Sequence, residues 1–140
     1  MGLFQSKDNN GKMRATPTMT STVQAPLFNG LLYRLVDECD NTLGFFNNST
    51  DYEFRVTYLF NVQCYIEPLD KTSATEQDDG ILCEVCVYPG ETQRFVRGEI
   101  AGYESKIDAV LLSDEYFSLH EDRKPDKYYG HVGPFKGSLF

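Results

Sequence analysis

The chain has 140 residues, enough for one domain of ordinary size with a single hydrophobic core and no need of disulfides or metals. Its net charge of −8 leaves no basic stripe to replace phosphate counterions, which argues against a nucleic-acid partner. The charge is uneven, since residues 1–30 carry a net +2 and residues 31–140 a net −10.

Residues 1–7, MGLFQSK, match the M-G-x-x-x-[ST] pattern of an N-myristoylation acceptor. Removal of the initiating methionine would expose the unhindered amine of Gly2, and Ser6 and Lys7 are the residues that the acyltransferase would recognise. The alternative is a chance Met-Gly start, because any chain can begin in this way. We expect the acylated form, with myristate on Gly2.

A stretch without apolar periodicity follows, from residue 8 to residue 25, which predicts a flexible linker of the kind that a lipid tether needs. We therefore expect residues 1–26 to form a flexible acylated tail. No apolar run reaches the roughly 20 residues that cross a bilayer, so membrane contact must come from elsewhere. The side chains expected at the membrane are Leu3, Phe4, Lys7, Lys12 and Arg14.

The domain begins with two short apolar runs bounded by turn residues, at 31–36 and 43–46, which indicate its first strands. The four residues that follow contain two overlapping N-glycosylation sequons, Asn47-Asn48-Ser49 and Asn48-Ser49-Thr50. An acylated chain in the cytosol never meets the glycosylation machinery, so these residues are predicted to form a turn.

The segment at residues 52–60, YEFRVTYLF, is the clearest strand in the chain and predicts the centre of the core. Its large apolar side chains recur at every second position, which is the period of a strand with one face against a core. On that face each aromatic ring can bury about 150–250 Å². The residues that share it are Tyr52, Phe54, Val56, Tyr58 and Phe60.

Four more strands are predicted, at residues 63–67, 81–88, 92–100 and 103–112. The polar, acidic segment 71–80 is expected to be a loop. Pro89 and Gly90 suit the two central positions of a tight turn, so the strands on either side of them are expected to pair as a hairpin.

Ser113 is a favourable N-cap, with acidic residues directly after it, and predicts one short helix near the C-terminus. Residues 119–140, rich in charge, proline and glycine, are expected to form an irregular tail. About seven strands with turn signals at short intervals predict an all-β fold, an antiparallel β-sandwich at residues 27–118.

The cysteines, at positions 39, 64, 83 and 86, are interpreted as reduced thiols in the cytoplasm, because no secretory leader is recognised. Cys83 and Cys86 form a C-x-x-C, a spacing found in redox and zinc sites. In a strand, however, residues three apart point to opposite faces. We therefore expect structural thiols.

No catalytic residue, cofactor or metal site is predicted. A cysteine hydrolase would need His120 or His131, the only histidines, to fold back onto a strand cysteine, and no local motif supports this. A rival function is Ca²⁺-dependent phospholipid binding by the acidic clusters at residues 37–40 and 76–79, if these meet at one end of the sandwich. Without EF-hand spacing, solvated loop charge is the preferred interpretation.

Several segments occur in order along the chain: NGLLYRLV at 29–36, FNN at 46–48, the strand at 52–60, VYPGET at 87–92, FVRG at 95–98 and GY at 102–103. Together they resemble the domain shared by the kinetoplastid calpain-related proteins, and the Met-Gly start makes the chain most similar to the small myristoylated proteins of that family. The resemblance covers about residues 27–117.

The resemblance implies a β-sandwich domain without the protease core, on the cytoplasmic face of the plasma or flagellar membrane. Gly2 is the one functional residue that carries over. Dually acylated members have a palmitoylated cysteine beside that glycine, where this chain has Leu3. We expect a non-enzymatic, N-myristoylated adaptor or structural protein, held reversibly by inner-leaflet lipids and bound to a protein partner at the membrane or cytoskeleton.

Overall fold

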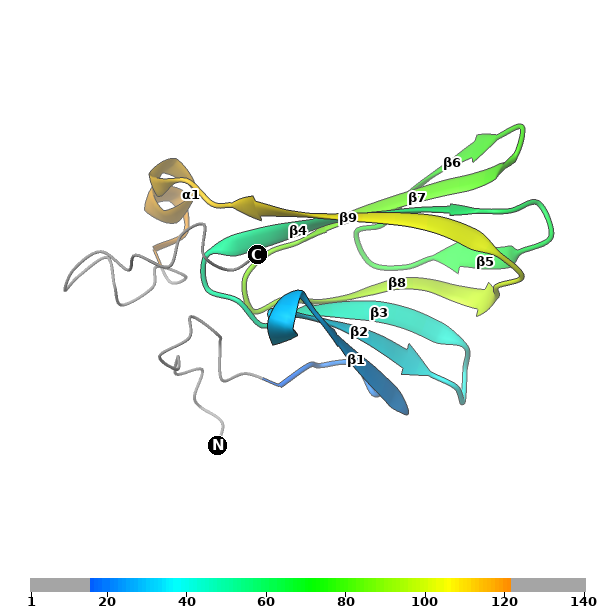
Figure 1. Cartoon of the computed structure of the whole chain (residues 1–140), viewed down its shortest axis with the longest axis horizontal. Coiled ribbons are helices and arrows are strands. Elements are labelled where there is room, and N and C mark those ends of the chain that lie inside the picture. Colours follow the sequence, from blue (N-terminus) through cyan, green and yellow to red (C-terminus); the bar gives the residue numbers. More distant parts are fainter. Residues whose placement is uncertain (1–15, 122–140) are drawn as a thin grey trace.

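The computed structural model describes residues 16–121 as two antiparallel β-sheets stacked face to face (Figure 1). One sheet has the strand order β1-β2-β3-β8-β5 and the other β6-β7-β4-β9, so the predicted all-β sandwich is confirmed. A 3₁₀ turn, η1 (Phe28–Gly30), follows β1, and helix α1 (Asp114–Leu119) lies beyond the end of β9. The strands are β1 (Val23–Leu27), β2 (Leu32–Asp37), β3 (Thr42–Asn47), β4 (Tyr52–Phe60), β5 (Tyr65–Pro68), β6 (Ser73–Gln77), β7 (Gly80–Val87), β8 (Thr92–Glu99) and β9 (Tyr103–Leu111).

The core lies between the sheets and is built around β4, which pairs with β7 on one side and β9 on the other. The predicted core face of β4 is confirmed, because each of its five residues is at most 4% exposed. From the opposite sheet, Phe45 and Phe95 meet Tyr58, with ring centroids 6.0 and 5.2 Å from its own. Edge-to-face ring contacts of this kind add to the stabilisation that burial supplies.

Strand β8 buries two consecutive side chains, Phe95 and Val96, although a regular strand would turn one of them outward. The cause is a bulge against β3, where the register steps from Leu43 opposite Val96 to Gly44 opposite Arg94. The bulge places one more apolar side chain in the core than strict alternation allows.

Asn47, at the end of β3, connects the two sheets at one end of the sandwich. Its fully buried side chain donates hydrogen bonds from Nδ2 to the carbonyls of Tyr52, at 2.7 Å, and Val87, at 2.8 Å. Its Oδ1 accepts from the backbone N and the Oγ of Ser49. The predicted turn at residues 47–50 is confirmed, and the Asn47 amide is fully engaged within it.

A second polar junction joins the loops at the opposite end of the sandwich, between β4 and β5 and between β8 and β9. The backbone N of Asn61 donates to the carbonyl of Gly102, at 3.0 Å. The buried thiol of Cys64 also donates to that carbonyl, at 3.3 Å, and accepts from the backbone N of Ala101. Cys64 therefore has the structural role that the sequence predicts.

The described residues contain nine strands, so the expected number of about seven is too low. The two missed strands, β1 and β6, are outer strands, each paired with a single neighbour. All five residues of β6 are exposed, and none of β1 is fully buried. A strand with solvent on both faces has no apolar period, and Pro26 in β1 is tolerated because an edge strand has free positions. The segment 71–80 is therefore a strand and a tight turn rather than a loop.

The expected hairpin between residues 81–88 and 92–100 is wrong, since β7 and β8 belong to different sheets. The tight turn itself is confirmed: the backbone N of Glu91 donates to the carbonyl of Tyr88, and Gly90 has φ +78°. Pro and Gly set the geometry of this turn whether the chain stays in one sheet or crosses to the other. Here the turn carries the chain between the sheets.

Residues 16–22 lie against the five-stranded sheet, so the expected flexible linker does not extend over 16–25. The backbone N of Thr18 donates to Thr92 Oγ1, and that of Thr22 to the carbonyl of Val36. Met19 packs onto the strand at Gly44, where an added Cβ would lie only 2.5 Å from its sulfur. The ordered domain therefore begins before the predicted boundary at residue 27.

Helix α1 closes one end of the four-stranded sheet. The predicted N-cap is confirmed, because Ser113 Oγ accepts a hydrogen bond from the backbone N of Tyr116, at 3.1 Å. Phe117 is fully buried, and the ring of Tyr116 stacks on that of Tyr88 at 5.3 Å. Among residues 16–121, no helix is both long and apolar enough to cross a membrane.

Replacement of Val56 by Asp is expected to lower the free energy of unfolding by about 3 kcal/mol or more, because it places an unpaired carboxylate among aromatic rings. Thermal unfolding followed by circular dichroism measures the effect. Thr57→Asp is the matched control, since Thr57 is the next residue of β4 and faces outward, and we expect a change below about 1 kcal/mol. Equal unfolding temperatures for Val56→Asp and the parent would contradict the assigned core face.

Candidate functional site

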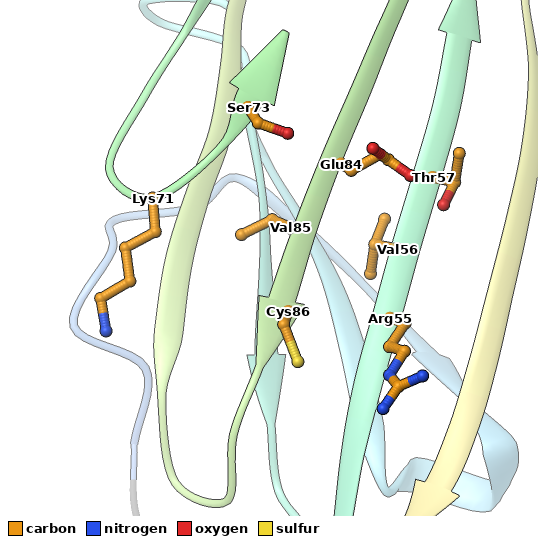
Figure 2. A pocket seen from close by; sticks show the side chains of 8 residues that line it. All are labelled: Arg55, Val56, Thr57, Lys71, Ser73, Glu84, Val85 and Cys86. Atoms are coloured by element: carbon orange, nitrogen blue, oxygen red, sulfur yellow. The ribbon is translucent and has the colours of Figure 1, made fainter.

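A shallow groove of about 380 Å³ lies on the outer face of the four-stranded sheet (Figure 2). Most of its lining comes from the neighbouring strands β4 and β7, and the rest from the start of β6 and the residues before it. The lining residues are Arg55, Val56, Thr57, Lys71, Ser73, Glu84, Val85 and Cys86.

Strand alternation puts polar side chains in this groove, because β4 and β7 turn every second residue into the core and the next one outward. The register pairs Arg55 with Cys86 and Thr57 with Glu84. On β6, Ser73 is the partner of Glu84. The groove therefore presents cations, a carboxylate, hydroxyls and a thiol on adjoining strands (Figure 2).

A nearly buried carboxylate, that of Glu53, organises one end of the groove. It is 8% exposed and accepts a hydrogen bond from Arg55 Nε at 2.6 Å. It also accepts one from Cys86 Sγ at 3.3 Å. Contact with Glu53 raises the pKa of Arg55. Burial raises the pKa of Cys86 to about 11, and the Glu53 carboxylate adds to the shift.

Cys86 is thus held as a neutral thiol at physiological pH, the opposite of an activated cysteine, whose pKa is lowered by nearby positive charge. Tyr88, whose pKa is raised to about 12 chiefly by its side-chain hydrogen bond with Cys86, also stays neutral. No histidine is among the eight lining residues. The groove offers hydrogen bonds and an ion pair, which suits it to contacts with another molecule more than to nucleophilic attack.

The prediction that the two cysteines of the C-x-x-C point to opposite faces of their strand is confirmed. Cys83 is fully buried in the core, whereas Cys86 faces the groove. Burial raises the pKa of Cys83 to about 11. The four cysteines all lie within the described residues and all are free thiols.

His120 is exposed at the C-terminal end of α1, where its Nδ1 lies 3.0 Å from the carbonyl of Tyr116 and its ring stacks on that residue at 4.3 Å. Its role there is local, at the helix end. His131 lies outside the described residues.

The acidic clusters weighed for Ca²⁺ lie in the β2–β3 turn and in the β6–β7 hairpin. Asp37 accepts a hydrogen bond from the backbone N of Cys39, at 3.0 Å, and Asp40 lies 3.6 Å from Arg97. Within residues 16–121, no three acidic, cysteine or histidine side chains gather as they would around a metal ion.

The residues predicted to carry or recognise the lipid, or to touch the membrane, precede the described part of the chain. These are Gly2, Leu3, Phe4, Ser6, Lys7, Lys12 and Arg14.

Sequence reasoning missed Glu53, treating it only as a polar residue that alternates with the core of β4. A signal was present, since Glu53 and Arg55 are two apart in a strand and so share one face. Lys71 reaches the groove because it lies just before β6, a strand that the sequence did not reveal. No pattern in the sequence therefore pointed to Lys71.

Comparison with known proteins adds three findings. A family model described as a domain of unknown function, DUF1935, matches residues 13–112. Among solved structures, the NMR structure of SMP-1 (Small Myristoylated Protein) from Leishmania major is 34% identical, with a TM-score of 0.71, over 89% of this chain and 99% of that one. A Leishmania major hypothetical protein is 35% identical, with a TM-score of 0.67, over 73% of this chain and 93% of that one. No curated protein matches the chain.

The raised thiol pKa values predict a loss of stability at alkaline pH. Unfolded thiols ionise near pH 9, whereas Cys83 and Cys86 in the fold ionise near pH 11. Their contribution to the free energy of unfolding is complete below pH 9 and is lost as the pH rises through 11. Between these values the unfolded state releases the thiol protons more readily than the folded state does. Urea unfolding at pH 8 and pH 10.5 measures the fall.

The Cys86→Ser variant should lose less stability between these two pH values than the Cys39→Ser variant, because Cys39 is exposed and serine does not titrate. An equal fall in both would contradict the raised pKa of the partly buried Cys86 thiol.

Proposed function

The chain belongs to the DUF1935 family, and on that premise we propose that it is a non-enzymatic adaptor or structural protein, held at the cytoplasmic face of the plasma or flagellar membrane by myristate on Gly2. The observation that carries the proposal is the similarity to SMP-1, described as a small myristoylated protein, along 89% of this chain. The acceptor pattern MGLFQSK, with Ser6 and Lys7 read by the acyltransferase, supports it independently. The relation to calpain-related proteins stays a prediction.

A non-enzymatic role agrees with the chemistry of the described domain. The groove thiol of Cys86 is kept protonated, and its neighbour Glu53 is engaged with Arg55. A polar, charged groove on the open face of a sheet is suited to hydrogen bonds and ion pairs with a protein partner. We assign the groove of Figure 2 to that partner.

The membrane attachment we propose is reversible. One myristoyl chain gives only marginal binding, with a partition constant of about 10⁴ M⁻¹. Lys7, Lys12 and Arg14 each add up to about 1 kcal/mol near an anionic leaflet, whereas the net −10 of residues 31–140 is repelled by the same surface. Leu3 and Phe4, placed beside the acyl chain, add apolar contact.

The Gly2→Ala variant, which lacks the acylation site, is expected to move from the membrane fraction to the soluble fraction of its native cell. High salt should release part of the parent protein, because basic residues supply part of the binding. Fractionation at low and high salt measures both effects. Gln5→Ala is the matched control, since it retains the acceptor glycine and every residue expected at the membrane, and it should pellet. A Gly2→Ala form that still pellets would show that the domain, or a partner, is the anchor.

The rival function, Ca²⁺-dependent binding of phospholipid by the acidic loops, makes a different prediction for unacylated protein. We expect Ca²⁺ at up to about 1 mM, which spans the range of extracellular Ca²⁺ modules, to produce no binding to anionic liposomes. Pelleting of liposomes with increasing Ca²⁺ measures this. Ca²⁺-driven pelleting that Asp40→Asn abolishes would favour the rival function.

A further inference from the structure

A second hollow, of about 300 Å³, opens at the edge of the sandwich between the two sheets. The five-stranded sheet contributes β2, β3 and β8, and the other sheet contributes the start of β9 with the residue that leads to it. Its lining residues are Arg34, Val36, Asn41, Thr42, Leu43, Gly98, Ile100 and Tyr103.

Arg34 is a charged residue on the inner face of β2. In the register it is the partner of Phe45, a core residue, so the two side chains share the face that looks toward the other sheet. Its Nη2 lies 3.3 Å from the hydroxyl of Tyr103. Its Nε is buried and has no hydrogen-bond partner in the described part of the chain. The guanidinium therefore has an unsatisfied donor in the wall of the hollow.

The charge of Arg34 is also uncompensated among the described residues. Residues 16–121 contain six lysine and arginine side chains, and each of the five besides Arg34 lies within ion-pair distance of a carboxylate. Arg34 forms no ion pair with any residue of that range, although residues 31–140 carry twice as many acidic as basic groups. A partly buried cation without a counter-ion is unfavourable, so the hollow favours an anionic ligand.

The rest of the hollow is largely apolar. Val36 and Leu43 form its wall on one sheet, and Ile100 and the ring of Tyr103 form the other side. Ile100 is 41% and Tyr103 40% exposed, so large apolar groups remain open to solvent beside the partly buried charge of Arg34. A guanidinium beside apolar side chains in one hollow matches a carboxylate that carries an aliphatic chain.

We propose that this hollow binds an aliphatic carboxylate, with its head group on Arg34 and its chain along Val36, Leu43 and Ile100. Guanidinium binds carboxylate through charge-assisted hydrogen bonds, which the partly buried head group of Arg34 can donate from the wall of the hollow. The volume lies at the lower end of the range of about 300–1,000 Å³ typical of ligand pockets, which selects a short or medium chain. The proposal goes beyond the membrane role, because the acyl group on Gly2 is an amide without a free carboxylate.

The test is a titration of unacylated, ¹⁵N-labelled full-length protein with sodium octanoate below its micelle concentration, followed by NMR. Saturable shifts are expected at the amides of Val36, Leu43 and Gly98. Octan-1-ol, which has the chain without the charge, and inorganic phosphate, which has charge without the chain, should each bind about tenfold more weakly or worse. Equal binding of either would overturn the assignment of an aliphatic carboxylate.

Arg34→Gln should weaken octanoate binding at least about tenfold, since the charge-assisted hydrogen bonds are lost. Arg94→Gln is the matched control, because Arg94 lies on the other face of the five-stranded sheet and pairs with Asp70, and its affinity for octanoate should equal that of the parent.

Thermal unfolding checks that Arg34→Gln folds. If it does not, Ile100→Glu carries the same test, since it places a like charge at the exposed rim and should weaken octanoate binding to a similar degree. Unchanged affinity in the folded variant, or saturable shifts confined to amides away from the hollow, would overturn the proposal. Because the protein is unacylated, failure here leaves the proposed anchoring by myristate untouched.

Discussion

The fold depends on how the chain passes between its two sheets, and Asn47 is the residue that makes the passage possible at one end. The turns from β3 to β4 and from β7 to β8 both cross the sandwich there, and the carbonyls of Tyr52 and Val87 beside them accept hydrogen bonds from its side chain. A buried polar group without a partner costs about 1–3 kcal/mol. One amide satisfies two such carbonyls and, through its own backbone, holds the turn at Gly90 and Glu91. Cys64 and the carbonyl of Gly102 serve a comparable purpose at the opposite end.

Each sheet is held at both ends, and its side chains point alternately inward and outward along every strand. This alternation determines the chemistry of each face. The inner face is aromatic, and at its edge, where Arg34 and Tyr103 lie, there is a hollow. The outer face of the four-stranded sheet is polar, and Glu53 there keeps Cys86 and Arg55 in a fixed arrangement. The two candidate binding regions thus have different chemistry, because one is a polar surface and the other an apolar slot with a single charge.

The sequence reveals a strand when one of its faces is buried and the other is exposed to solvent. It does not reveal a strand that is exposed on both faces. The strand β4 is recognisable because its core and solvent faces differ at every second residue. The strands β1 and β6 are exposed along most of their length and leave no such pattern. The path of the chain between sheets is not readable from Pro89 and Gly90, since the same turn serves either course. The inward direction of Arg34 is hidden as well, because it lies within an apolar run at residues 31–36 that suggests burial on both faces.

The docking of residues 16–22 and β1 on the five-stranded sheet has a mechanical consequence. A load applied through the N-terminal side first meets the contacts of residues 18–22 and then the β1–β2 ladder, which begins at the pair of Val23 with Val36. No residue of β1 is fully buried, so its resistance to force comes mainly from that row of hydrogen bonds. Pulled from this end, β1 would separate pair by pair, while the ring contacts between Tyr58 and Phe95 stay intact. Under force from the N-terminal side, β1 would therefore detach before the remaining eight strands lose their packing.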